Sequence, residues 1–198
     1  PIDATTSEAG RPILSVLRHY LPQCTSVLEI GSGTGQHAVF FAEKFPRLIW
    51  HSSDLEENHA GIQAWISYSG LNNIQSPLVL DVKQNQWPKI KIDAVFSANT
   101  VHIMSWLSVE KMFSGVGRIL NPAGVFILYG PFNYHGDYTS ESNARFDSWL
   151  KNRDPLSGIR HFEALFKLAE ANGMSLDHDY EMPVNNRILV WKKIADCA

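Results

Sequence analysis

Residues 27–35 read VLEIGSGTG, an apolar run that ends in an acid and is followed by three glycines at alternate positions. A helical pattern starts directly after the third glycine and extends over residues 36–45. Glycine lacks a Cβ and adopts positive φ, so this junction can bring bare backbone close to a ligand. The N-terminal amides of the following helix point to the same place. The junction therefore predicts a ligand site after the first strand of an α/β sheet.

The rest of the chain repeats this alternation of short apolar runs and helical patterns. Apolar runs of strand length occur at residues 27–30, 48–50, 78–80, 94–96 and 125–129. Helical spacing occurs at residues 12–20, 36–45, 61–69 and 108–120. Pro12 lies at the start of the first of these helices, where proline is expected in the first turn. The alternation predicts a mostly parallel sheet with helices on both faces.

The C-terminal third departs from the alternation in two ways. Residues 132–160 form a long polar segment, with a short helix expected at 144–151. This segment follows the fifth strand at the carboxyl edge of the sheet, so we expect it to select the substrate. After a helix at 162–172, two extended stretches at 175–182 and 187–192 are joined by the turn-forming sequence PVNN. They predict an antiparallel hairpin at the edge of the sheet.

Length and composition favour one globular domain over residues 1–198, with residues 1–25 as an N-terminal helical segment. The net charge is −3 and no run of five Lys or Arg occurs, which disfavours nucleic acid as a partner. Cys24 and Cys197 form no CxxC, so neither a disulfide framework nor a metal site is expected. No apolar stretch reaches about 18 residues and no leader pattern is present, so we expect a cytoplasmic protein without a membrane partner. The first residue is Pro rather than Met, which leaves room for residues before it.

The glycine spacing indicates which ligand the bend binds. The dinucleotide fingerprint is GxGxxG, whereas this chain has GxGxG and carries Gln36 where the third glycine would stand. Glu29 lies two residues before the first glycine, and an acid there does not suit a diphosphate. It suits a ligand with hydroxyls and positive charge, such as S-adenosylmethionine, which has a ribose, an ammonium group and a sulfonium. The alternative is that the glycines only permit tight packing.

The ends of the next three strands carry further candidates. Asp54 ends the second strand, where its carboxylate can accept from both ribose hydroxyls. It can also serve as a helix N-cap, and Glu56 competes for the ribose role. Asp81 closes the third strand, where it can accept from the adenine amine while the Val82 amide faces the ring; a solvated acid is the alternative. The segment from 97 to 102 ends the fourth strand and would border the methionine part of the cofactor.

These residues resemble the motifs of class I S-adenosylmethionine-dependent methyltransferases. The chain is most similar to a methyltransferase-like branch that includes methyltransferase-like protein twenty-six. The matching pieces include PILSVL (12–17), VLEIGSGTGQHAVFFA (27–42), SANTVHIMSW (97–106), YGPF (129–132) and MPVNN (182–186). The chain departs from the branch at Glu8-Ala9, where members carry an Arg-Asn pair that could help close the cofactor pocket. The resemblance implies a Rossmann-like fold with a seven-stranded sheet and an antiparallel last strand.

The resemblance also implies S-adenosyl-L-methionine as cofactor and S-adenosyl-L-homocysteine as product. We expect cofactor contacts from Glu29, Gly31, Ser32, Gly33, Gly35, Gln36, His37, Asp54, Asp81, Val82, Asn99 and Thr100. The substrate pocket is expected at Tyr129, Phe132, Arg145 and Arg160. Arg145, Arg153 and Arg160 suit an anionic acceptor, or alternatively pair with Asp137, Asp147 and Asp154.

His102 is the best-placed candidate for a general base, ahead of His135, Asp147 and Glu181. A histidine in an apolar stretch such as VHIM is otherwise a hydrogen-bonded structural residue. The fourth strand lacks an Asn-Pro-Pro-Tyr type box, which favours a small-molecule acceptor over adenine or glutamine. The predicted function is therefore methyl transfer to a small molecule. The alternatives are a non-catalytic S-adenosylmethionine-binding regulatory or adaptor protein, and a nicotinamide oxidoreductase, against which Gln36 and the terminal hairpin argue.

Overall fold

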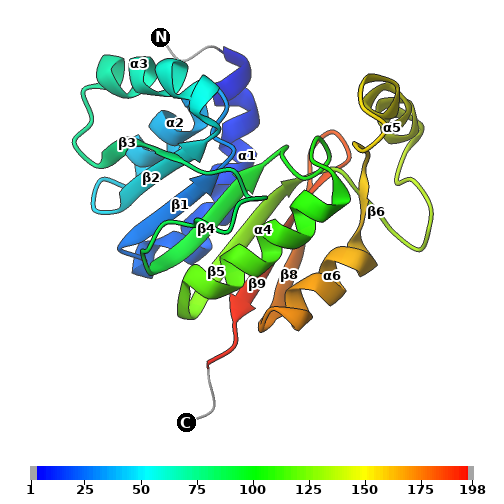
Figure 1. Cartoon of the computed structure of the whole chain (residues 1–198). Coiled ribbons are helices and arrows are strands. Elements are labelled where there is room, and N and C mark those ends of the chain that lie inside the picture. The colour runs from blue at the N-terminus through cyan, green and yellow to red at the C-terminus, as the bar shows by residue number, and fades with distance from the viewer. Residues whose placement is uncertain (1–3, 196–198) are drawn as a thin grey trace.

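A seven-stranded sheet in the order β3-β2-β1-β4-β5-β9-β8 forms the centre of the molecule (Figure 1). The structure, a computed structural model, describes residues 4–195, and for residues 4–9 it describes the backbone alone. The first five strands pair in parallel, whereas β9 is antiparallel to both of its neighbours. The strands of this sheet are β1 (Ser26–Ile30), β2 (Ile49–Asp54), β3 (Ile74–Val79), β4 (Ile92–Ala98), β5 (Leu120–Gly130), β8 (Met174–Met182) and β9 (Asn186–Lys193). The predicted fold class, a mostly parallel sheet with a C-terminal antiparallel hairpin, is confirmed.

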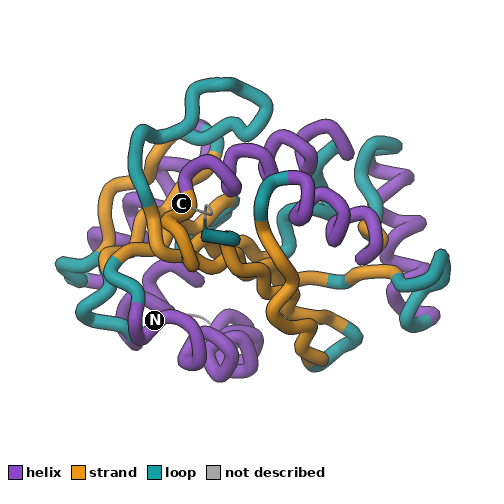
Figure 2. Tube along the Cα trace, turned by 90° about the horizontal axis from the view of Figure 1, so that it is seen from below, coloured by secondary structure: helices purple, strands orange, loops and turns teal. Residues whose placement is uncertain are grey.

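Helices cover both faces of the sheet, as the view from below shows (Figure 2). They are α1 (Ala4–Tyr20), α2 (Gln36–Lys44), α3 (His59–Ser69), α4 (Trp106–Ile119), α5 (Glu141–Arg153) and α6 (Phe162–Ala171), with 3-10 turns at Leu21–Gln23 and Glu56–Asn58. The helices α1, α2 and α3 pack in one hydrophobic cluster on one face, while α4 and α6 pack in a second cluster on the other. Among residues 4–195, no helix is both long enough and apolar enough to cross a membrane.

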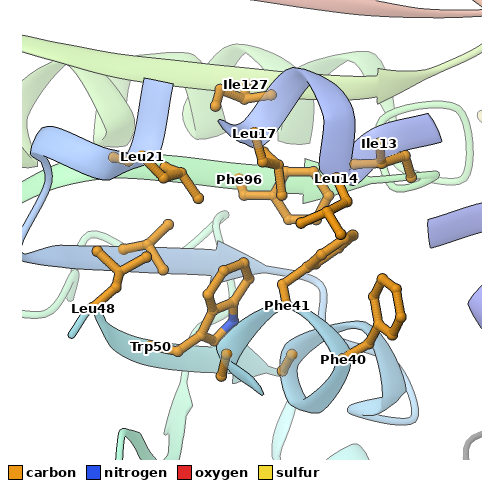
Figure 3. Close-up of a cluster of buried hydrophobic side chains, with 14 of the residues drawn as sticks. Ile13, Leu14, Leu17, Leu21, Phe40, Phe41, Leu48, Trp50, Phe96 and Ile127 are labelled. Atoms are coloured by element: carbon orange, nitrogen blue, oxygen red, sulfur yellow. The ribbon is translucent and has the colours of Figure 1, made fainter. Parts of the chain in front are cut away.

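The core on the α1 side contains a group of aromatic side chains from α2, β2 and β4 (Figure 3). Phe41 of α2 meets Phe96 of β4 edge-on at 5.4 Å between ring centroids and stacks on Trp50 of β2 at 5.8 Å. Leu17 of α1 is fully buried in the same cluster. Burying each such side chain contributes about 1.5–3 kcal/mol, so this packing fixes the strands that lead to the predicted site.

The N-terminal helix differs from its prediction. α1 begins at Ala4, so Pro12 lies inside the helix and not in its first turn. Proline in a helix interior removes one hydrogen bond and costs about 3 kcal/mol. The fully buried Ile13 and Leu17, with Leu14 between them, supply apolar burial that offsets this cost.

Residues 131–161 leave the sheet and form an insertion beyond the end of β5. Within it, β6 (Phe132–Asn133) pairs in parallel with β7 (Arg160–His161), and α5 lies between these two strands in the chain. Figure 1 shows α5 standing apart from the sheet at the end where the chain leaves β5. The predicted helix at 144–151 is longer because the Ser140 hydroxyl caps it by accepting from the Asn143 amide at 3.1 Å.

The predicted turn between the last two strands is present. The Asn186 amide donates to the Pro183 carbonyl at 3.4 Å, and both Val184 and Asn185 have positive φ. Positive φ at both central residues is typical of the two-residue turns that join hairpin strands. The β-branched Val184 is strained in this conformation.

Candidate functional site

The glycine bend between β1 and α2 is held by the end of β2. The amides of Gly31 and Ser32 both donate to the Ser53 carbonyl at 3.0 Å. The Gly33 amide donates to Asp54 Oδ2 at 2.7 Å. All three glycines of the bend have positive φ, which other residues adopt only with strain. The bend is therefore a fixed loop at the carboxyl end of the sheet.

The three glycines serve different purposes. A Cβ on Gly31 would lie 2.8 Å from Cγ2 of Thr100, and one on Gly35 would lie 3.0 Å from Cα of Ile62. These two glycines allow close packing, which was the alternative reading of the motif. A Cβ on Gly33 would meet nothing within 4 Å. Gly33 is thus where the backbone of the bend faces open space.

Glu29 supports the bend from the core. It is buried, and its Oε2 accepts from the Ser32 hydroxyl at 3.0 Å and from the Trp50 indole N–H at 3.1 Å. Burial raises the pKa of Glu29 to about 7, although both hydrogen bonds lower it; the nearby Asp54 carboxylate adds to the rise. Glu29 therefore joins β1, the bend and β2 in one network. Its contact with a ligand stays a prediction.

Asp54 lies at the surface of the bend with both carboxylate oxygens directed to neighbouring donors. Besides Gly33, it accepts from the Leu55 amide at 2.7 Å and from Asn58 Nδ2 at 2.8 Å, both at Oδ1. A carboxylate offers about four acceptor positions, so a ligand hydroxyl can still be bound. The N-cap of α3 is Asn58, so the expected capping role of Asp54 at a helix is replaced by these local bonds.

The remaining predicted cofactor residues follow the same edge of the sheet. Asp81 lies in the turn after β3, where its Oδ1 accepts from the Lys83 amide at 3.0 Å, and Val82 packs in the core. Gln36 is the first residue of α2, and the ring of His37 stacks on Phe41 at 5.6 Å. Thr100 packs against Gly31. The structure therefore brings the predicted residues from β1, β2 and β4 together, with Asp81 at the end of the neighbouring strand.

His102 and Asn99 converge on Gly130 at the end of β5. A Cβ placed on Gly130 would lie 3.7 Å from His102 Nδ1 and 3.9 Å from Asn99 Oδ1. His102 is buried, and its Nδ1 has no hydrogen-bond partner. Burial, followed by the charge of Arg160, lowers the pKa of His102 to about 4, so its ring is neutral at pH 7. An unpartnered buried polar atom costs about 1–3 kcal/mol, so His102 is destabilising in this arrangement.

The other candidates for a general base are engaged elsewhere. His135 is exposed on the insertion, with Nδ1 3.5 Å from Glu163. Asp147 accepts from Tyr138 Oη at 2.6 Å, from the Ile159 amide at 2.7 Å and from Lys151 Nζ at 2.6 Å. Glu181 is an exposed partner of Arg187 at 3.1 Å. Among these four candidates, only His102 is buried with a ring nitrogen that has no hydrogen-bond partner.

The predicted substrate residues differ in their surroundings, and their contact with an acceptor stays a prediction. Tyr129 Oη accepts from Asn186 Nδ2 at 2.9 Å, and Phe132 is fully buried in the α4 cluster. Arg145 lies on an exposed turn of α5 beside Glu141 at 3.6 Å. The guanidinium of Arg160 donates to backbone carbonyls.

The contacts of the arginines differ from the expected ion pairs. The guanidinium of Arg160 donates to carbonyl oxygens of the protein itself, and binding of an anionic acceptor by these arginines stays a prediction. Arg153 lies over the ring of Trp149 at 5.2 Å. Asp147, expected to pair with an arginine, pairs with Lys151.

Two residues of the site were not predicted from the sequence. Gly130 lies within the YGPF motif, which marked the position without revealing its role. The Phe146 ring meets the His102 ring edge-on at 5.3 Å, although the two residues come from different segments of the chain. Nothing in the local pattern around Phe146 indicates this contact.

Comparison with family models gives one match, over residues 1–193. The chain belongs to the family described as "Protein of unknown function (DUF938)". The side chains of Glu8 and Ala9, where the chain departs from the resembled branch, lie outside the part that the structure describes. Assignment of this DUF938 protein to the branch of methyltransferase-like protein twenty-six stays a prediction.

Solved structures show which fold the DUF938 protein shares. An O-methyltransferase family protein from Burkholderia thailandensis matches with a TM-score of 0.84 and 12% identity, covering 99% of this chain and 60% of that chain. Mitomycin 7-O-methyltransferase MmcR matches with a TM-score of 0.82 and 14% identity, covering 96% and 54%. Human N-acetylserotonin methyltransferase in complex with SAM matches with a TM-score of 0.80 and 13% identity, covering 96% and 53%.

These TM-scores show that the chain shares the fold of these methyltransferases, and at such low identity they show the fold alone. The DUF938 chain spans 60% or less of the length of each of these three structures.

Proposed function

We propose that the DUF938 protein transfers a methyl group from S-adenosyl-L-methionine to a small-molecule acceptor. The observation that carries this proposal is the open backbone at Gly33 beside the carboxylate of Asp54, at the carboxyl edge of a methyltransferase-type sheet. In open α/β sheets, ligands bind at this edge. Several solved structures with this fold are named as methyltransferases, and one is described with SAM and another with SAH.

The amides of the bend argue against a dinucleotide. Gly31 and Ser32 donate to Ser53, Gly33 donates to Asp54, and Gly35 donates to Ser32. A diphosphate needs such amides as donors, whereas here they are satisfied within the protein. A ligand with a ribose and a positive charge suits this surface, and a nicotinamide dinucleotide does not.

The residues present fit S-adenosyl-L-methionine. Asp54 has a remaining acceptor position for a ribose hydroxyl, Asp81 lies at the next strand end for the adenine amine, and Asn99 lies toward β5 for the methionine part. When bound there, this cofactor supplies an electrophilic methyl group. The protein's contribution is to hold the acceptor close to that group in the correct orientation.

His102 is the residue that we assign to the acceptor. When its neutral ring is protonated at Nε2, Nδ1 is a hydrogen-bond acceptor, and it lies beside Gly130 without a partner in the protein. A hydroxyl acceptor would donate to this nitrogen and release its proton there as methyl transfer proceeds. Phe146 of the insertion lies against the ring and keeps water from that side.

Calorimetry with S-adenosyl-L-methionine and S-adenosyl-L-homocysteine tests the proposal directly. We expect both ligands to bind, and absence of binding at millimolar ligand would refute it. A panel of small hydroxyl and amine acceptors then identifies the substrate class. With the acceptor found, His102→Ala is expected to lower turnover, while His135→Ala, at the exposed histidine, serves as the matched control.

A non-catalytic S-adenosylmethionine-binding protein is the second candidate function. The observation that favours it is the pKa of about 4 at His102, since an efficient general base has a pKa near the working pH. Cofactor binding without turnover across the acceptor panel, together with a partner protein recovered by pull-down, would support this candidate. A blank NADH titration would exclude the oxidoreductase.

A further inference from the structure

The last residues of the insertion hold the loop that carries His102. This loop comprises residues 101–104 and lies in the connection between β4 and α4. Its four successive carbonyls accept hydrogen bonds from residues 157–160. The bonds run from Arg160 Nε to Val101 O at 3.0 Å, from Gly158 N to His102 O at 2.8 Å, from Ser157 Oγ to Ile103 O at 3.2 Å and from Arg160 Nη2 to Met104 O.

Arg160 is the centre of this contact. Its guanidinium bridges the first and last carbonyls of the loop and also donates to Leu156 O at 2.9 Å. The planar fork of a guanidinium can hold several acceptors in fixed directions, which the single ammonium of lysine cannot do. Hydrogen bonds from a charged donor are stronger than those between neutral groups. The loop is therefore fixed at both ends by one side chain.

Residues 157–160, which make these bonds to the loop, are themselves held by α5. Asp147 of α5 is buried and accepts from the Ile159 amide at 2.7 Å. The same carboxylate binds Lys151 and Tyr138, which also belong to the insertion. Phe146, the residue before Asp147, contacts the His102 ring. The insertion thus contacts both the backbone carbonyl and the ring of His102.

We propose that Arg160 is a positioning residue for His102: with Gly158 it fixes loop 101–104 and so holds Nδ1 of the histidine beside Gly130. The assignment of His102 to the acceptor rests on the proposed function. The hydrogen bonds between residues 157–160 and the loop do not depend on that assignment. Arg160 was predicted from the sequence as an anion-binding residue, and its contacts assign it this different role.

Two variants separate the geometry of the clamp from its charge. Arg160→Lys keeps the positive charge and loses the fork, so the loop is released while the field at His102 is largely kept. Arg160→Gln keeps donor N–H groups and loses the charge. Arg160 is the charged group that, after burial, lowers the pKa of His102, so the glutamine variant raises that pKa. Arg145→Gln removes an exposed arginine of α5 and is the control.

Hydrogen exchange and histidine NMR on the full chain without ligand measure both effects. In Arg160→Lys, we expect the Gly158 and Ile103 amides to exchange about tenfold faster or more, while Val95 in β4 is unchanged. In Arg160→Gln, we expect His102 to titrate at higher pH than in the parent protein. Neither measurement uses the cofactor, so both remain informative if the proposed function fails.

Either of two results would overturn the positioning role. One is an unchanged exchange rate of the Gly158 and Ile103 amides in Arg160→Lys. The other is equal acceleration of exchange at Val95 and Gly158, which would mean general destabilisation. If the Arg160 variants do not fold, Ser157→Ala removes one bond to Ile103 and gives the same exchange comparison on a milder scale.

Discussion

The amide of Gly33 donates to Oδ2 of Asp54 at 2.7 Å, although 21 positions separate the two residues in the chain. The bond joins the one glycine of the bend that faces open space to the acid at the end of β2. Because of this bond, the bend presents the carboxylate of Asp54 instead of a free amide donor at Gly33. This relationship distinguishes the site from a phosphate-binding loop of similar sequence.

Replacement of Asp54 tests the acid directly. Asp54→Ala should weaken S-adenosyl-L-methionine and S-adenosyl-L-homocysteine by about 1.5–3 kcal/mol, or about tenfold to a hundredfold, because a charge-assisted bond to the ribose is lost. The affinity of Asp54→Asn for each ligand should fall between the affinities of the parent protein and of Asp54→Ala. Calorimetry gives the affinities, and Glu57→Ala is the exposed acidic control. An affinity that stays the same in Asp54→Ala would place the ribose elsewhere, with Glu56 as the next candidate.

The bend glycines should differ when each is changed to alanine. Positive φ costs about 1–2 kcal/mol in either position. Gly31→Ala adds a Cβ at 2.8 Å from Thr100, so its total loss of unfolding free energy should be about 2–4 kcal/mol. The unfolding free energy of Gly33→Ala should fall only by the cost of positive φ. This variant should show the larger loss of cofactor affinity. Urea unfolding and calorimetry on both variants measure this, and equal effects on both quantities would contradict the division of roles.

Glu29 should make stability depend on pH. Its pKa in the folded protein is raised to about 7, so the folded state keeps a proton that the unfolded state loses above about pH 4.5. The sign is therefore a loss of stability as pH rises from about 4.5 to 7, of about 3 kcal/mol at most, with no further change above. Glu29→Gln should flatten this part of the profile.

Urea unfolding between pH 5 and 8 measures the effect of Glu29. Glutamine keeps an oxygen that accepts from Ser32 and Trp50, so the variant should fold. Glu57→Gln, at an exposed acid, is the matched control and should keep the slope of the parent protein. A Glu29→Gln profile with an unchanged slope would show that the carboxyl group is already ionised when folded.

Gly130→Ala should separate cofactor binding from acceptor binding. The new Cβ would lie 3.7 Å from His102 Nδ1, an ordinary contact distance, and Gly130 does not have positive φ. The fold and the cofactor affinity should therefore be kept, while methyl transfer to the identified acceptor should fall about tenfold or more because the added methyl group lies against Nδ1 of His102. Gly61→Ala, where a Cβ meets nothing within 4 Å, is the control. Full turnover in Gly130→Ala would move the acceptor away from His102.

The sequence predicted those parts of the molecule that depend on local pattern. Strand and helix alternation is visible because each element buries one face, and the bend is visible because positive φ requires glycine. Pro12 was misplaced because burial of the residues after it outweighs the local preference of proline. The different roles of Gly31 and Gly33 depend on Thr100, about 70 positions away, and so are not written in the motif.

The contacts of His102 could not be predicted for the same reason. Its carbonyl binds the amide of Gly158 and its ring meets Phe146, both more than 40 residues later in the chain. Backbone carbonyls as partners leave no signature in the sequence, since every residue has one. The guanidinium of Arg160 could equally have suited an anion or an acid, and only the fold shows which acceptors lie within its reach.

The strand β9 lies inside the sheet between β5 and β8, although it follows both of them in the chain. Until residues 186–193 have been synthesised, β5 ends the sheet with its ladder open and β8 has no neighbour to pair with. The Asn186 amide group that holds Tyr129 is missing during the same interval. A chain that stops before residue 186 therefore loses two strands of the sheet together.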